Sequence, residues 1–193
     1  ALGARLAAED LSILIVEADF VFEEVFEAAP CLRLVGVCRN ATNQVDIAAA
    51  TAHGVAVTHA PGRNTNAVAE MTVAVMLALA RRIPQAHGLV SGGGWSDPAL
   101  GCRFFRGREV AGATVGVVGF GQIGRAVTAK CIALGARVLV ADPLVPDRDV
   151  TALGGEPAGM PALAASDFVT LHVPDLQEPR ALIDATFLAL MQP

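Results

Sequence analysis

The sequence contains no apolar run long enough to cross a lipid bilayer. The longest run, residues 71–80, is far shorter than the roughly 20 residues that a membrane-spanning helix needs. The first residues also lack the pattern of a signal peptide, because Arg5, Glu9 and Asp10 lie among short apolar pieces. Even with 53% hydrophobic residues and a mean hydropathy of +0.52, the sequence therefore predicts a cytoplasmic protein with no membrane partner.

Basic residues are too scattered to form a surface for nucleic acid. The 14 arginines and lysines are outnumbered by 19 acidic residues, so the net charge is −5 and the isoelectric point is about 5.3. Nucleic-acid-binding domains instead gather positive charge on one face. We therefore expect no nucleic-acid partner.

Patterns typical of metal sites and of serine nucleophiles are absent as well. The cysteines have no CxxC spacing, the histidines form no HExxH or HxxxH pattern, and no serine stands in a GxSxG setting. We predict no metal, and we expect the cysteines to be reduced, buried small hydrophobic residues. The cysteines are Cys31, Cys38, Cys102 and Cys131.

Apolar and helical patterns alternate along the first part of the chain. Strands are expected over residues 13–16, 32–38 and 55–60, with helices over residues 21–29 and 46–53. Such alternation is typical of parallel βαβ units.

A long helix is expected next, from Asn64 or Asn66 through Arg82. It is apolar nearly all round, which predicts burial between layers or domains. The triplet Gly92-Gly93-Gly94 follows and favours a connection. We therefore divide the chain into two α/β domains, residues 1–90 and residues 91–193.

The second half repeats the alternation. Strands are expected over residues 114–118, 137–141 and 168–173, and helices over residues 124–134 and 162–165. This order predicts a second doubly wound parallel sheet.

Three glycines in this half have the spacing of a pyrophosphate cradle. In VVGFGQIGR, residues 117–125, Gly119, Gly121 and Gly124 follow an apolar strand and open a helix. Asp142 ends the next strand, 18 residues beyond Gly124 (142 − 124). Together these residues form the dinucleotide fingerprint, in which the acid accepts hydrogen bonds from the ribose and repels the 2′-phosphate of NADP. We predict NAD as the cofactor; a glycine turn without a ligand, and a methyltransferase or flavoprotein turn, are the alternatives.

Four segments resemble the D-isomer-specific 2-hydroxyacid dehydrogenases, with the phosphoglycerate dehydrogenase branch nearest. They are VDIAAATAHGVAVTHAPGRNTNAVAE (residues 45–70), ALARRIPQA (78–86), VGVVGFGQIGR with ADP (115–125 and 141–143) and SDFVTLHVP (166–174). The resemblance implies a flavodoxin-like substrate domain (residues 1–90, partial) and an NAD-binding Rossmann domain (residues 91–193, incomplete). It also implies a homodimer.

The same resemblance assigns site residues by position. Gln122 and Ile123 would lie at the pyrophosphate, and Asp142 and Pro143 at the adenosine ribose. The turn of His172, Val173 and Pro174 would lie at the edge of the cofactor. These roles are implied by the family alone.

Two segments depart from the family pattern. Residues 38–43 have no glycine where the substrate loop usually has several. Asn40 tolerates positive φ better than most residues, so it is expected to replace a glycine there and is counted with the candidate cofactor-site residues. Residues 175–179 lack the threonines that often follow the His-Val-Pro turn, which predicts weaker cofactor binding.

The family's catalytic histidine, its supporting carboxylate and its arginine belong to a part of the fold that follows a segment like residues 187–193. We therefore assign no catalytic residue, and we expect the sequence to be a fragment trimmed at both ends. The resemblance implies NAD-dependent oxidation or reduction of a small 2-hydroxy or 2-keto acid, such as 3-phosphoglycerate or glyoxylate. The alternative is a non-catalytic NAD-binding regulatory module like the corepressors that resemble this family.

Overall fold

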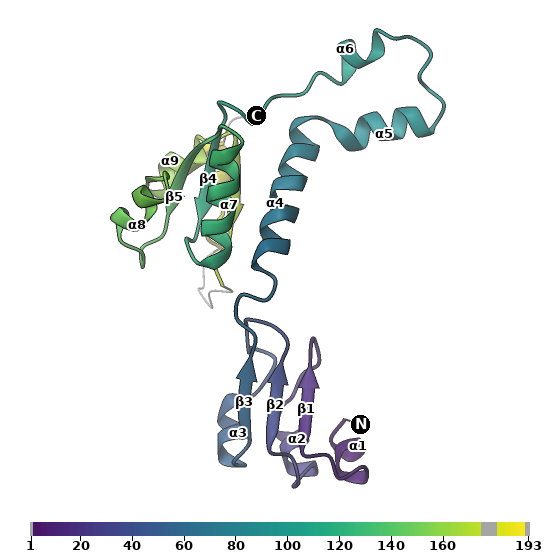
Figure 1. Ribbon diagram of the computed structural model, residues 1–193, viewed down its shortest axis with the longest axis vertical. Coiled ribbons are helices and arrows are strands. Elements are labelled where there is room, and N and C mark those ends of the chain that lie inside the picture. Colours follow the sequence, from purple (N-terminus) through teal and green to yellow (C-terminus); the bar gives the residue numbers. More distant parts are fainter. Residues whose placement is uncertain (1, 175–180, 192–193) are drawn as a thin grey trace. The chain divides into compact units, whose positions relative to one another are not determined.

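The computed structural model describes residues 2–174 and 181–191 and divides the chain into two compact units. The units are Ala1–Arg63 and Asn64–Pro193, so the division falls before the boundary at residue 90 that the glycine triplet suggested. The reason is that α4 (Thr65–Ala80) packs along α7 (Gln122–Ala133) and so belongs to the second unit. Figure 1 shows the helices and strands of each unit.

The first unit is a three-stranded parallel sheet with helices on one face. The strands β1 (Ile13–Val16), β2 (Leu34–Val37) and β3 (Ala56–His59) pair in that order. Apolar residues of the sheet and of α1 (Leu2–Ala8), α2 (Glu23–Ala28) and α3 (Ile47–Ala52) form its core. The opposite face of β1 exposes Ile13 and Ile15, because side chains alternate along a strand.

The second unit has a four-stranded parallel sheet whose order reverses at its first strand. The order is β6 (Glu156–Pro157), β5 (Arg137–Ala141), β4 (Thr114–Val118) and β7 (Phe168–Leu171). The chain therefore leaves β4 toward β5 and later returns to pair β7 on the other edge of β4. Ligands of such sheets bind at this reversal, beyond the carboxyl ends of the strands.

Helices cover both faces of this sheet. One core cluster joins α4, α7 and α8 (Asp147–Ala152) to Val115, Val117, Val138 and Val140. A second cluster joins α9 (Met160–Ala164) and α10 (Ala185–Leu190) to Val118 and Leu139. The expected α/β fold with parallel sheets is confirmed.

Helix α4 is less covered than its sequence suggested. Only Ala69, Met76 and Ala80 are buried, whereas Met71 is 65% and Leu79 62% exposed. The helix was expected to be buried between layers or domains, and within its own unit α7 covers one stripe of small and apolar residues.

Two further helices follow α4 and were not predicted. Arg82 has a φ of 54°, which turns the chain into α5 (Ile83–Ser91), and α6 (Leu100–Phe104) comes after the glycine triplet. Neither helix buries a residue. We call residues 83–104 the arm. Its exposed apolar side chains are Ile83, Val90, Trp95 and Phe104.

The cysteines are free, but the expectation that all are buried is wrong. Cys31 and Cys102 are exposed and Cys38 is half-buried, since they lie in a turn, in the arm and after the end of β2. Cys131 is buried in α7, and its burial raises the pKa of the thiol to about 11.

The described residues contain neither a membrane-spanning helix nor a cluster of metal ligands. None of the helices in this part of the chain has the length and apolar character needed to span a membrane. The same residues bring together no group of three or more metal-ligating side chains.

Candidate functional site

Gly119 makes the turn that leaves β4. Its φ is +91°, a conformation that favours glycine, and a Cβ atom there would lie 2.8 Å from the carbonyl oxygen of His172. Its N–H donates to the carbonyl of Ala141 at 2.9 Å. The turn therefore passes closely between the ends of β5 and β7.

Gly121 and Gly124 differ in what surrounds them. A Cβ atom on Gly124 would overlap the carbonyl oxygen of Gly119, so only glycine lets α7 begin this close to β4. A Cβ atom on Gly121 would meet nothing within 4 Å, and its φ of −71° suits any residue. Internal packing does not explain glycine at 121, whereas close approach of a ligand to the backbone would.

The start of α7 presents backbone donors. The first helical N–H groups, those of Gln122, Ile123 and Gly124, have no partner one turn earlier, and the Gly121 cap makes no side-chain hydrogen bond. This 12-residue helix also places the positive end of its dipole here. Such a terminus favours an anionic group.

Asp142 lies directly against the glycine turn. Its Oδ2 accepts a hydrogen bond from the Phe120 N–H at 2.7 Å, and its Oδ1 accepts one from the Leu144 N–H at 2.9 Å. An ionised carboxylate has about four acceptor positions, so two remain for hydroxyl groups. Asp142 is half-buried and the neighbouring Pro143 is exposed.

The turn after β7 lies beside Gly119. The His172 N–H donates to the Val118 carbonyl at 2.7 Å, and Val173 lies next to the same glycine. His172 Nε2 lies 3.0 Å from Thr170 Oγ1, and burial lowers the pKa of the imidazole. The structure thus brings His172 and Val173 next to the glycine turn, with the exposed Pro174 following. The unusual stretch at residues 175–179 lies outside the described residues.

Asn40 belongs to the first unit. Its carbonyl oxygen lies 2.8 Å from His59 Nδ1, at the carboxyl ends of β2 and β3. Asp10 and Arg82 are the non-glycine residues with positive φ in the described chain, so the expectation that Asn40 adopts that conformation is wrong. The loop forms without it, since it is fixed by this hydrogen bond and by one from the Ala60 N–H to the Arg39 carbonyl at 3.1 Å.

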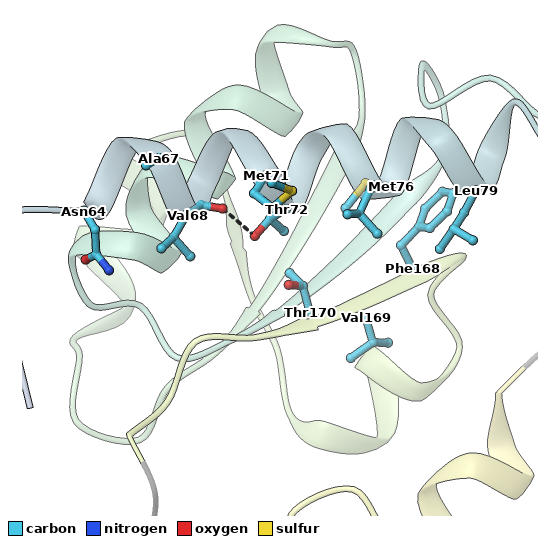
Figure 2. A pocket seen from close by; sticks show the side chains of 11 residues that line it. Asn64, Ala67, Val68, Met71, Thr72, Met76, Leu79, Phe168, Val169 and Thr170 are labelled. Carbon is cyan, nitrogen blue, oxygen red and sulfur yellow. Dashed lines mark hydrogen bonds between the residues drawn. The ribbon is translucent and has the colours of Figure 1, made fainter. Parts of the chain in front are cut away.

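A separate apolar groove of about 630 Å³ lies between α4 and β7 (Figure 2). Met71, Thr72 and Met76 line it from the helix, and Phe168 and Thr170 from the strand. The residues predicted to bind the cofactor are not among those lining it. The groove is therefore distinct from the glycine turn.

Three contacts at the turn have no signature in the residue spacing. Thr65 Oγ1, at the start of α4, donates to Gln122 Oε1 at 3.3 Å. The Arg125 guanidinium lies over the Phe120 ring and pairs with Asp149. The contacts from Thr65 and Asp149 join α7 to other helices, which a motif of single residues does not encode.

The sheet reversal, the glycine turn, the helix start and the acid at the next strand define a dinucleotide-binding α/β domain. The residues present fit such a cofactor, because backbone donors face an open approach at Gly121 and a carboxylate lies beside them. Residues 73–193 match the NAD-binding domain of the D-isomer specific 2-hydroxyacid dehydrogenases, and the chain belongs to that family.

Curated relatives of the chain support the phosphoglycerate dehydrogenase branch of this family. The chain is 40% identical, over 83% of its length, to a D-3-phosphoglycerate dehydrogenase of Archaeoglobus fulgidus, and covers 30% of that protein. It is 38% identical, over 94% of its length, to one of Mycobacterium tuberculosis, covering 34% of it. A crystal structure of D-lactate dehydrogenase from Aquifex aeolicus, complexed with NAD and lactic acid, matches all of this chain and 56% of that one, with a TM-score of 0.83 and 27% identity. The chain spans between 30% and 54% of the length of the curated relatives it matches.

Proposed function

We propose that this protein transfers hydride between NAD and a small 2-hydroxy or 2-keto acid. The observation that carries the proposal is the glycine turn at the sheet reversal with Asp142 hydrogen-bonded to it, in a chain of this family. The bound nicotinamide would accept the hydride from C2 of the hydroxy acid, or return it to the keto acid.

The chain's own residues would bind and orient the cofactor. The N–H groups at the start of α7, at Gln122 and Ile123, would hold the pyrophosphate, with Gly121 leaving room for it. Asp142 would accept from the ribose hydroxyls, with Pro143 beside it. The turn of residues 172–174 would border the cofactor.

Asp142 also supports a preference for NAD over NADP. Its carboxylate accepts two hydrogen bonds from backbone N–H groups, which fix its position beside the glycine turn. A fixed negative charge repels the 2′-phosphate of NADP.

Relatives supply the class of acid. Two are named D-3-phosphoglycerate dehydrogenases, and one structural neighbour holds lactic acid. We propose 3-phosphoglycerate, or an acid like glyoxylate, as the substrate of the whole protein. Oxidation of a hydroxyl group also requires a proton acceptor and a cation for the carboxylate, and we assign neither role to a residue of this chain.

The test is consumption of NADH by the purified whole protein with glyoxylate, pyruvate and 3-phosphohydroxypyruvate in turn. We expect loss of NADH absorbance with at least one acid, and slower loss when NADPH replaces NADH. Binding of NADH with no turnover of any acid would contradict hydride transfer and favour a non-catalytic NAD-binding module.

We propose further that the protein forms a homodimer through the arm. The arm buries none of its residues and exposes Val90, Trp95 (51%) and Phe104 (58%). Exposed aromatic side chains are common anchors of interfaces. Light scattering should give the mass of a dimer for the wild type and a lower mass for Trp95→Ser; a monomeric wild type would contradict the proposal.

A further inference from the structure

Contacts of Arg125 join the first turn of α7 to the start of α8. The guanidinium carbon lies 4.5 Å from the centre of the Phe120 ring, and Nη2 lies 3.5 Å from Oδ2 of Asp149. Phe120 is fully buried, so its ring gives the cation a fixed surface. Arg125 is thereby held between the glycine turn and α8.

The same phenylalanine contacts the acid at the ribose position. The Phe120 N–H donates to Asp142 Oδ2 at 2.7 Å, while its ring lies under Arg125. Arg125 and Asp142 are therefore both in contact with one residue. Asp142 directly follows β5, and Asp149 lies in the first turn of α8.

We propose that Asp149 enforces the preference for NAD by restraining Arg125 against Phe120. This inference rests on the proposed function, because that function places the adenosine ribose at Asp142. While Arg125 is paired with Asp149, the hydrogen bonds that Asp142 makes in the described structure come from backbone N–H groups, and its charge stays available to repel a phosphate. A released Arg125 would offer the planar set of donors that suits phosphate oxygens.

Asp149 has a second cationic neighbour, Arg148, and the experiment must distinguish its effect from that of Arg125. Arg148 Nε lies 3.8 Å from Asp149 Oδ1, so removing the carboxylate frees two arginines. Arg148 is 85% exposed, whereas Arg125 is 43% exposed and lies in the first turn of α7. We assign the expected change in cofactor preference to Arg125.

The experiment measures the dissociation constants of NAD⁺ and NADP⁺ by calorimetry. In Asp149→Asn, the ratio of the NADP⁺ constant to the NAD⁺ constant should fall about three- to tenfold, as expected for one added charge-assisted contact to phosphate. Asp147→Asn is the matched control, because it removes the same charge from the same turn of α8. Its ratio should change by less than about twofold, the size of a screened surface effect.

Two double variants identify the arginine. Asp149→Asn with Arg125→Gln should restore the wild-type ratio, and Asp149→Asn with Arg148→Gln should keep the lowered one. Asp149 is 41% exposed, so its replacement should leave the fold intact, and thermal unfolding checks this.

The failure of this inference is distinct from the failure of the proposed function. A wild-type protein that binds NAD⁺, with the same ratio in Asp149→Asn and Asp147→Asn, overturns the inference alone. Survival of the effect in the variant lacking Arg125 also overturns it. A wild-type protein that binds neither dinucleotide overturns both.

Discussion

The three glycines of the motif are required for three different physical reasons. Gly119 needs its positive φ, Gly124 needs the absence of a Cβ atom against a carbonyl, and Gly121 needs neither within the protein. Gly119 and Gly124 are therefore needed for the fold, whereas Gly121 leaves open space at the surface.

Alanine at Gly124 should therefore reduce stability, whereas alanine at Gly121 should reduce cofactor binding. Gly124→Ala should cost about 1–3 kcal/mol or more of unfolding free energy, because the new methyl group overlaps backbone. Gly121→Ala should leave stability within about 0.5 kcal/mol of the wild type, since it meets open space. It should still weaken NAD⁺ binding by about tenfold, equal to ~1.4 kcal/mol. Urea unfolding and calorimetry measure the two quantities, and normal binding by Gly121→Ala would contradict the role given to that position.

His172 predicts a pH dependence with a defined sign. Burial lowers the pKa of its imidazole below the ordinary 6.5, so the unfolded chain binds the proton more readily than the folded one. The stabilisation from neutral His172 is then present above pH 6.5 and is lost as the pH falls from 6.5 toward the lowered folded pKa.

The variant His172→Gln tests this sign. Between about pH 7.5 and pH 5, the wild-type protein should lose more unfolding free energy than the variant does. Equal losses, measured by urea unfolding at each pH, would show that the folded protein does not disfavour the charged imidazole.

For helix α4, the pattern of apolar residues predicted the helix and not its buried side. The sequence predicted a helix from Asn64 or Asn66 through Arg82, and the structure has Thr65–Ala80, but the pattern did not show which side is covered. That depends on α7, whose small and buried residues Gly124, Val127 and Thr128 belong to a different segment.

Two methionines of α4 test which side packs. Met76 is 5% exposed, and Met76→Ala should cost about 2–5 kcal/mol because it leaves a cavity. Met71 is 65% exposed, and Met71→Ala should stay within about 0.5 kcal/mol of the wild type. Equal destabilisation of the two variants in urea would contradict the packing of α4 on α7.

At the scale of the whole molecule, the sequence predicted the central strands of the sheets well and several of the helices poorly. The strands at residues 13–16, 114–118 and 137–141 have the predicted bounds, because apolar runs flanked by turn residues leave few alternatives. Helices α1, α5, α6, α8 and α10 were missed, since they are short or bury little and so lack a strong apolar period.

The candidate site was predictable where chemistry depends on local spacing. The glycines and Asp142 are set by a strand, a turn and a helix in one stretch, and the structure brings them together. The restraint on Arg125, the contact from Thr65 and the backbone of Asn40 depend on neighbours that are remote in sequence or on loop geometry, which the sequence does not specify.

The most direct test of the account is calorimetry of NAD⁺ binding to the folded protein. We predict saturable binding of one NAD⁺ per chain. Asp142→Asn should weaken it about tenfold, because a hydrogen bond to a charged group contributes roughly 1.5–3 kcal/mol. A correctly folded wild-type protein that produces no heat with NAD⁺ or NADH would contradict the account.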